Sequence, residues 1–258
     1  MSSEVSRVSG VSGIGRSAAL SDNAARLEAS GLAKRFGGFR ALDGLSFRLE
    51  RGEILGLMGP NGSGKTTAIN VVSGVYSADG GEVCLDGKPV TALAPHRRVR
   101  LGLNRTFQVP RPLRGLTVHQ NVEVAAVYSG AGTDVVAQCL EWAELAHLAG
   151  RRASTLNNSQ QKRLDLARAL ATRPRVLLID EMGAGLNPAE LETMAHKLCA
   201  LAEQGVALVV VEHVLGFLQM VSSRVIVMNA GRAIFEGTVA AAAEDPEVVR
   251  VFLGERHH

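Results

Sequence analysis

Residues 59–67 decide the fold of this chain, and they read Gly59-Pro60-Asn61-Gly62-Ser63-Gly64-Lys65-Thr66-Thr67. They match the phosphate-loop pattern G-x-x-x-x-G-K-[ST] in full. The preceding run, residues 53–58, is short and apolar, and residues 67–72 continue without a helix breaker. The loop is therefore expected to join a buried strand to a helix, which is the context that the motif requires. This stretch predicts a nucleotide-binding protein.

Each part of the loop has its own physical task. The glycines let successive backbone N–H groups turn toward phosphate oxygens, and the helix N-terminus adds the positive end of its dipole. Lys65 is placed to reach the β- and γ-phosphates, and the Thr66 hydroxyl is placed to bind Mg²⁺. The alternative is a glycine-rich turn that only joins a strand to a helix, and it leaves the lysine and threonine unexplained. ATP and GTP remain open at this point.

Length and composition exclude several classes of protein. A hydrophobic content of 46% over 258 residues is enough to bury a sizeable core, which excludes disorder throughout. The net charge of +3 comes from interspersed charges and gives no argument for a nucleic-acid partner. Three isolated cysteines favour a reducing compartment over a disulfide scaffold. No apolar run approaches the ~20 residues of a membrane span.

Outside the loop, the pattern of apolar and turn residues predicts the remaining elements. Residues 1–25 are rich in Ser, Gly and Ala without periodicity, and we expect a disordered tail there. Residues 118–148 are mainly helical in pattern, with a break at 130–133, and a further helix is expected over 160–171. Strands are expected at 27–36, 42–49, 80–88, 103–107, 224–229 and 232–235, with a last helix at 246–253.

The segment between Asp86 and Glu123 contains no acidic residue and encloses Gln108. Its basic residues are Lys88, Arg97, Arg98, Arg100, Arg105, Arg111 and Arg114. One interpretation is a solvated basic face. The other is a surface that meets an acidic partner or the anionic cytoplasmic leaflet, where each cation contributes about 1 kcal/mol.

Two apolar strands end in polar residues that can perform chemistry. Residues 176–179 are followed by Asp180-Glu181, and residues 206–211 are followed by Glu212-His213. In a phosphate-loop protein the first carboxylate can hold Mg²⁺ and the second can orient and deprotonate the attacking water. A surface acidic turn is the alternative. A single histidine is usually structural, but at the ligand-binding edge of a doubly wound sheet His213 is expected to contact the γ-phosphate.

The order of these motifs resembles the ATP-binding cassette (ABC) family over nearly all of residues 27–254. Residues 59–67 look like the Walker A loop, residues 176–180 fill the Walker B strand, and Gln108 in Arg-Thr-Phe-Gln resembles the Q-loop glutamine. The resemblance implies an α/β fold: a P-loop NTPase cassette with a mainly parallel core sheet, an antiparallel β subdomain and an inserted helical subdomain. The ATP-binding domain is then expected over residues 26–256, with the helical subdomain at approximately 115–172.

The same resemblance implies roles for single residues. Phe36, which the residues alone favour as a core aromatic, stands where the family's adenine-stacking ring lies. Glu181 and His213 match the catalytic glutamate and the switch histidine. Gln108 gains a role in contacting Mg²⁺ and water and in coupling the site to a membrane partner. The expected nucleotide is ATP. The expected ligands of Mg²⁺ are Thr66, Gln108 and Asp180.

A narrower resemblance is to the ATP-binding proteins of importers for branched-chain amino acids and for amides or urea. It rests on residues 35–38, 104–108, 184–190 and the ending 237–254. It implies an ATPase at the cytoplasmic face of the inner membrane that pairs with a second, different cassette subunit. The other implied partners are two membrane permease subunits and, indirectly, a periplasmic solute-binding protein. The solute is chosen elsewhere in such a complex.

One departure from the family concerns the signature motif. Where the family reads Leu-Ser-Gly-Gly-Gln or a near variant, this chain reads Leu156-Asn157-Asn158-Ser159-Gln160. Asn187 stands at the D-loop position that carries Asp in many members, although Asn fits the narrower group. A catalytically silent regulatory subunit is therefore one alternative to a motor subunit. A soluble cassette acting on nucleic acid is another, but such proteins normally carry two phosphate loops and this chain carries one.

Overall fold

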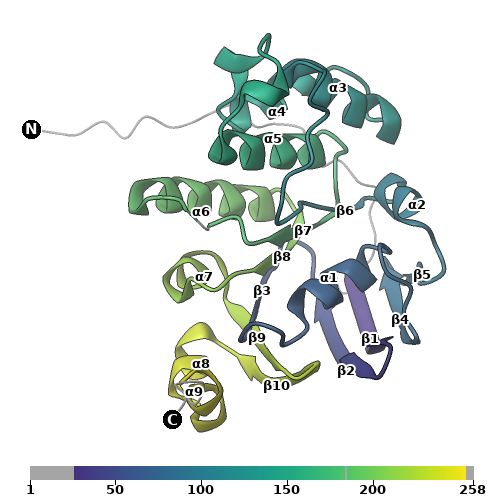
Figure 1. The fold of residues 1–258 in the computed structure, drawn as a ribbon, viewed down its shortest axis with the longest axis vertical. Helices are drawn as coiled ribbons and strands as arrows, with labels where there is room; N and C mark the ends of the chain where they lie inside the picture. Colours follow the sequence, from purple (N-terminus) through teal and green to yellow (C-terminus); the bar gives the residue numbers. More distant parts are fainter. Residues whose placement is uncertain (1–25, 184, 254–258) are drawn as a thin grey trace, which may run out of the picture.

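The computed structural model describes residues 26–183 and 185–253 (Figure 1). The tail predicted for residues 1–25 lies outside this range, as do Ala184 and residues 254–256 of the predicted domain. Within the described residues, no helix is both long enough and apolar enough to cross a membrane.

The larger sheet is mainly parallel and forms the centre of the molecule. Its strand order is β10-β9-β3-β8-β7-β6, and β10 alone among these described strands pairs antiparallel, with β9. Every residue of β3, β7 and β8 is buried, because the sheet is covered on both faces. The strands are β3 (Ile54–Met58), β6 (Leu103–Arg105), β7 (Val176–Asp180), β8 (Ala207–Val211), β9 (Arg224–Asn229) and β10 (Arg232–Gly237).

The smaller sheet is antiparallel and packs beside helix α1. Its order is β2-β1-β4-β5, and both β2 and β4 pair with β1. The strands are β1 (Leu27–Phe36), β2 (Phe39–Leu49), β4 (Gly80–Leu85) and β5 (Lys88–Pro89). Their inward leucines share one hydrophobic cluster with α1 and with one face of the larger sheet. The two sheets confirm the predicted fold class.

Two groups of helices, and the single helix α6 between them, can be followed from top to bottom in Figure 1. Helices α3, α4 and α5 pack on one another at the top of the view, α6 lies below them, and α8 and α9 lie at the bottom. The helices are α1 (Lys65–Val72), α2 (Pro95–Arg100), α3 (Val118–Ser129), α4 (Val135–Trp142), α5 (Asn158–Leu170), α6 (Pro188–Glu203), α7 (Leu215–Val221), α8 (Val239–Glu244) and α9 (Pro246–Leu253), with 3₁₀ turns η1 (Ala146–Leu148) and η2 (Ala153–Thr155).

The basic segment is less exposed than its composition suggests. Arg98 lies on α2, which was not predicted, and is buried with its guanidinium on backbone carbonyls. Arg105 is also buried, at the end of β6. The interpretation of all seven cations as one surface is therefore wrong. The members that remain exposed are Lys88, Arg97, Arg100, Arg111 and Arg114.

Candidate functional site

The phosphate loop runs from β3 into α1, as predicted, and its backbone requires glycine. Gly59 has φ +145°, and a Cβ there would lie 2.2 Å from the Met228 carbonyl oxygen. Gly64 has φ +107°, and a Cβ there would lie 2.5 Å from the Ala41 carbonyl oxygen. Any side chain at either position would force the backbone apart. The glycines therefore hold the loop tightly against the two neighbouring segments.

Lys65 is folded back over the loop that precedes it. Its Nζ donates to the carbonyl oxygens of Gly59 at 2.8 Å and Pro60 at 2.9 Å, and the residue is buried. Burial lowers the pKa of the ammonium, and the carboxylates of Glu181 and Asp180 act in the opposite direction. The charge is thus held at the centre of the loop, next to the polar ends of other strands.

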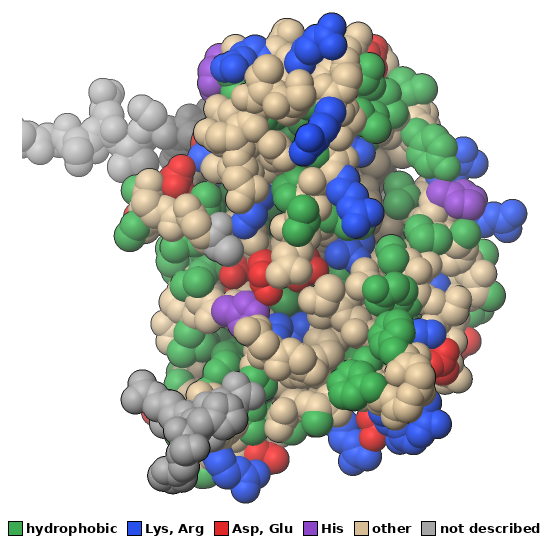
Figure 2. Space-filling model, in the orientation of Figure 1, with side chains coloured by type: hydrophobic (Ala, Val, Ile, Leu, Met, Phe, Trp, Pro, Cys, Tyr) green, Lys and Arg blue, Asp and Glu red, His purple; other side chains and the backbone are tan. Residues whose placement is uncertain are grey.

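Three predicted catalytic side chains meet at the mouth of this loop. Gln108 Nε2 donates to Glu181 Oε2 at 2.6 Å, and His213 Nε2 lies 3.0 Å from Glu181 Oε1. All three line a cavity of about 290 Å³, together with loop residues 61, 62 and 64–67. Figure 2 shows acidic side chains beside a histidine near the middle of the drawn face. The structure therefore brings the loop, Gln108, Glu181 and His213 into one site.

Asp180 lies beside this site at the end of β7 and is almost fully buried. Burial raises the pKa of its carboxyl group, and the nearby Arg105 guanidinium opposes that shift. Arg105 Nη2 lies 3.4 Å from Asp180 Oδ2, and the other guanidinium nitrogens bond to Asn70 Oδ1 and the Thr106 carbonyl. Asp180 Oδ1 has no hydrogen-bond partner among the described residues. A buried carboxylate oxygen is thus available to a further ligand.

Phe36 lies at the end of β1 with 43% of its surface exposed. Its ring meets the Tyr76 ring edge-on at 5.2 Å between centroids, and Lys34 Nζ lies 5.6 Å from its centre. The loop cavity is lined by Phe39 and not by Phe36. The role of Phe36 as the adenine contact therefore stays a prediction, and Phe39 is an aromatic neighbour that the sequence reasoning missed.

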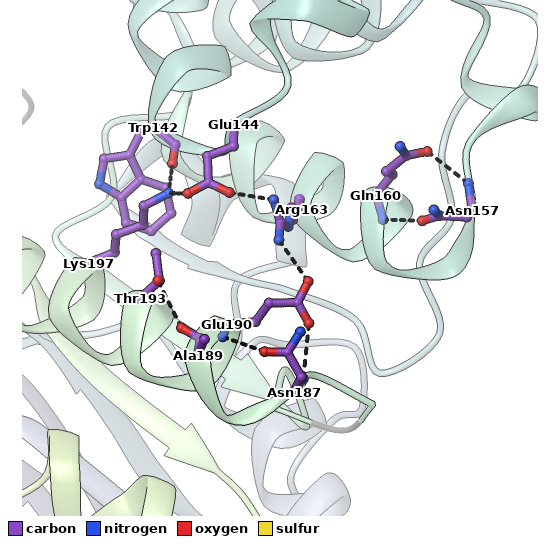
Figure 3. Close-up of polar contacts among 10 residues, drawn as sticks. All are labelled: Trp142, Glu144, Asn157, Gln160, Arg163, Asn187, Ala189, Glu190, Thr193 and Lys197. Carbon is purple, nitrogen blue, oxygen red and sulfur yellow. Dashed lines mark hydrogen bonds and ion pairs between the residues drawn. The ribbon is translucent and has the colours of Figure 1, made fainter.

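The altered signature lies apart from the phosphate loop. Asn157 is the N-cap of α5, and its Oδ1 accepts from the Gln160 amide at 2.9 Å, while its own N–H donates to Gln160 Oε1 at 3.1 Å (Figure 3). This is a complete capping box, and the helix therefore begins two residues before the predicted start. Asn157, Ser159 and Gln160 line a second cavity with Arg163 of α5, Glu190 of α6 and four residues of the segment 144–148. The signature residues thus form a group separate from the residues at the phosphate loop.

A network of charges holds α5 against α6 next to the signature. Arg163 of α5 pairs with Glu144 and with Glu190 of α6, and Lys197 of α6 donates to Glu144 Oε1 at 2.6 Å (Figure 3). The other Glu190 oxygen accepts from the Asn187 amide at 3.0 Å, in the capping box of α6. The signature helix and the D-loop position are therefore joined by one carboxylate.

Sequence reasoning gave no role to three side chains that support the site. Lys162 Nζ donates to the Glu181 carbonyl at 3.0 Å, and Asp165 accepts from the Phe107 amide at 2.7 Å. Glu212 accepts from the Gly183 amide, and burial raises the pKa of its carboxyl group. A charged residue directly before His213 was the available signal for Glu212. The contacts of Lys162 and Asp165 have no local sequence signal.

Comparisons with known proteins agree with this geometry. Residues 42–184 match the family model described as ABC transporter. The chain is 34% identical over 249 residues to the high-affinity branched-chain amino acid transport ATP-binding protein BraF of Pseudomonas aeruginosa, covering 89% of this chain and 98% of BraF. It resembles the crystal structure of the ADP conformation of MJ1267, an ATP-binding cassette of an ABC transporter, with 31% identity, a TM-score of 0.81 and coverage of 90% and 99%. It also resembles the dimeric post-hydrolysis state of the cassette MJ0796 bound to ADP and Pi, with 26% identity, a TM-score of 0.76 and coverage of 83% and 98%.

Proposed function

Because the chain belongs to the ABC transporter family, we propose that it drives an importer of branched-chain amino acids or of related amides or urea. The general role, an ATP-binding and ATP-hydrolysing subunit coupled to transport, follows from membership of the family. The observation that carries the hydrolytic assignment is the meeting of Gln108, Glu181 and His213 at the phosphate loop. The solute class rests on the named relative BraF and on the short stretches described above.

ATP binding is assigned to residues 59–67 and to Phe36. The loop amides and the N-terminus of α1 face the phosphates, and Lys65 exchanges its carbonyl partners for β- and γ-phosphate oxygens. Lys65 is well placed for this exchange because the carbonyls that hold it belong to the loop itself. Phe36 supplies an exposed aromatic face for adenine.

Thr66, Gln108 and Asp180 are the residues that would hold Mg²⁺. They fit a hard cation because each offers an oxygen, and the buried Asp180 Oδ1 has no partner among the described side chains and backbone groups. When bound there, Mg²⁺ would neutralise charge that develops on the phosphate oxygens. Arg105 orients the Asp180 carboxylate and opposes the rise in its pKa that burial causes.

Glu181 is assigned as the residue that orients and deprotonates the attacking water. Gln108 and His213 each contact one of its carboxylate oxygens, and each oxygen keeps a second acceptor site that a water can use. His213 then contacts the γ-phosphate. Gln108 couples the nucleotide state of the site to the surface segment that follows it in the sequence. The two side chains thus hold the general base in place beside the phosphate loop.

The full assembly is proposed to contain a second, different cassette subunit, two permeases and a periplasmic solute-binding protein. The signature residues 157–160 face the nucleotide of the second cassette, in keeping with their distance from the chain's own loop. The permeases meet the segment after Gln108, where Val109 is 72% exposed and Leu113, Arg111 and Arg114 are exposed beside it. The protein then lies peripherally at the cytoplasmic face of the inner membrane. Its ATP-binding domain is residues 26–256, with residues 115–172 as the helical subdomain.

Reconstitution tests this proposal. The chain is assembled with its permeases and second cassette in vesicles that contain ATP, and uptake of labelled leucine, acetamide and urea is measured with the binding protein outside. ATP-dependent uptake of one of these solutes, lost with Glu181→Gln, is expected. Uptake that is unchanged by Glu181→Gln would instead support the second candidate, a regulatory subunit with a degenerate signature. Failure of all three solutes with intact ATP hydrolysis would refute the solute class alone.

A further inference from the structure

The backbone of Glu181 is held in an unusual conformation. Its φ is +49°, in the left-handed region that residues with a side chain rarely adopt. Such a conformation persists only where the surroundings fix it, and it is concentrated at functional sites. The groups that hold the Glu181 backbone therefore also set the direction in which its carboxylate points.

Two different elements hold the Glu181 backbone, one through its N–H group and the other through its carbonyl group. The Glu181 N–H donates to the Val211 carbonyl of β8 at 3.0 Å, and the Glu181 carbonyl accepts from Lys162 Nζ of α5 at 3.0 Å. The first contact continues the register of β7 on β8. The second is made by a charged side chain from another element, and a charged donor makes the stronger hydrogen bond.

Helix α5 also holds the backbone next to Gln108, which is the hydrogen-bond partner of the Glu181 side chain. Asp165, three residues after Lys162 and hence on the same face of α5, accepts from the Phe107 amide at 2.7 Å. Phe107 precedes Gln108, whose Nε2 donates to Glu181 Oε2. One face of α5 thus fixes both ends of the Gln108–Glu181 hydrogen bond.

We propose that Lys162 is a positioning residue for the hydrolytic carboxylate of Glu181. By bonding to the Glu181 carbonyl, Lys162 keeps the strained backbone in place and aims the carboxylate at Gln108 and His213. The inference rests on the proposed function, because it takes Glu181 as the residue that activates water. It predicts that Lys162 acts on turnover and leaves ATP binding alone, since the Glu181 carbonyl to which Lys162 donates lies outside the phosphate loop.

Lys162→Met tests the proposal, with Lys197→Met as a matched control. Lys197 also donates to a backbone carbonyl from a helix, that of Trp142 at 2.7 Å, and its carboxylate partner is Glu144 (Figure 3). The ATPase kcat of the assembled transporter is expected to fall about 10- to 100-fold in Lys162→Met, the range for a misplaced catalytic group. The ATP affinity of the full chain, measured by calorimetry, should not change. Lys162→Arg should recover most of kcat, and Lys197→Met should keep it.

Two results would overturn the proposal. One is a kcat of Lys162→Met that matches Lys197→Met, and the other is an equal loss of kcat and ATP affinity, which marks a general structural role. If Lys162→Met does not fold, Lys162→Gln replaces it, because its shorter side chain cannot keep the same contact. Glu181→Gln serves as the reference: full activity in that variant refutes the proposed catalytic assignment itself. Loss in Glu181→Gln with no effect of Lys162→Met refutes only the positioning role.

Discussion

Arg98 anchors the C-terminal end of the phosphate-loop helix and provides a sharp test of the fold. Its Nη1 donates to the carbonyls of Val71 and Val72, the last two residues of α1, at 3.0 and 2.6 Å. Its Nη2 and Nε donate to the carbonyls of Thr91 and Leu93 at 2.6 and 2.9 Å. The guanidinium thus bonds to two carbonyls at the end of the helix, of which the Val71 carbonyl also accepts from the Gly74 amide at 3.1 Å, and it places a positive charge at the negative end of the helix dipole.

Arg98→Met should destabilise the protein by about 3–5 kcal/mol. The side chain is 2% exposed, and its removal leaves buried carbonyls unpaired, each at a cost of ~1–3 kcal/mol. Part of that cost is offset because the buried cation itself pays for desolvation, which lowers the pKa of Arg98. For a chain of this size ~4 kcal/mol corresponds to a fall in Tm of roughly 8–16 °C. Arg98→Lys should lose less, since an ammonium keeps the charge but reaches fewer carbonyls.

The assay is denaturant unfolding followed by circular dichroism, with Arg97→Met on the exposed side of the same helix as the control. Gly74 offers a second test, because a Cβ there would lie 2.7 Å from Arg98 Nε. Gly74→Ala should therefore be less harmful in the Arg98→Met background than alone, apart from the strain at its positive φ. A loss below about 1 kcal/mol in Arg98→Met would refute the reasoning, because it would mean that the carbonyls find other partners.

Three further predictions concern other parts of the chain. Lys65→Ala should weaken ATP binding about 10- to 150-fold by calorimetry, since a charged contact in a partly dry site contributes about 1.5–3 kcal/mol; unchanged affinity would contradict the loop assignment. Arg111→Glu with Arg114→Glu should reduce co-purification with the permease at physiological salt while ATP binding by the isolated chain is kept, and normal assembly would leave these residues as a solvated face. Glu212→Gln should raise Tm at neutral pH, because burial raises the pKa of Glu212 in the folded state and its charged form therefore costs stability once the pH exceeds the folded pKa. Below the unfolded pKa near 4.5 the two proteins should have the same Tm, and a gain that persists there would point to another cause.

Local sequence patterns correctly predicted the strands and helices whose bounds are set by residues within the element or directly beside it. The strands at residues 27–36 and 224–229 and the helix at 246–253 have the predicted bounds, because apolar spacing and flanking turns define them. The apolar pattern predicts a start of α5 that is two residues too late, because the first turn of this helix is polar and is fixed by the Asn157 cap instead of by apolar spacing.

Contacts between distant segments could not be predicted in this way. Arg98 and Arg105 were placed on a basic surface, yet their partners lie 26 and 75 residues away in the sequence, on Val72 and Asp180. A run of like charges shows only that no acidic neighbour is near in sequence. Whether each cation is solvated or buried depends on what the fold brings over it, and this information is absent from the local pattern.

The last prediction concerns the altered signature and follows from its observed conformation. The Asn157 side chain and backbone N–H are both engaged in the capping box of α5, so the loop folds normally. The Asn157 side chain, however, offers no hydroxyl to the γ-phosphate of a nucleotide on the partner. Asn158 and Ser159 add side chains where glycine allows close approach of backbone N–H groups to phosphate. In a heterodimer, the site built from this chain's residues 59–67 and Glu181 with an intact partner signature should hydrolyse ATP, and the reciprocal site should be slow.

Glu181→Gln should therefore abolish most turnover of the assembled transporter, whereas the equivalent change in the partner should do less harm. Restoring the motif with Asn157→Ser, Asn158→Gly and Ser159→Gly in this chain should raise turnover and should make the partner's glutamate matter more, because serine keeps the N-cap while supplying the hydroxyl. Steady-state ATPase at saturating ATP is measured for the unchanged transporter, for Glu181→Gln and for the partner's glutamate variant. It is also measured for the restored motif, alone and combined with the partner's glutamate variant. Equal losses from the two glutamate substitutions, or brisk hydrolysis by a homodimer of this chain alone, would show that Asn157-Asn158-Ser159 is a competent signature and that capping the helix is sufficient.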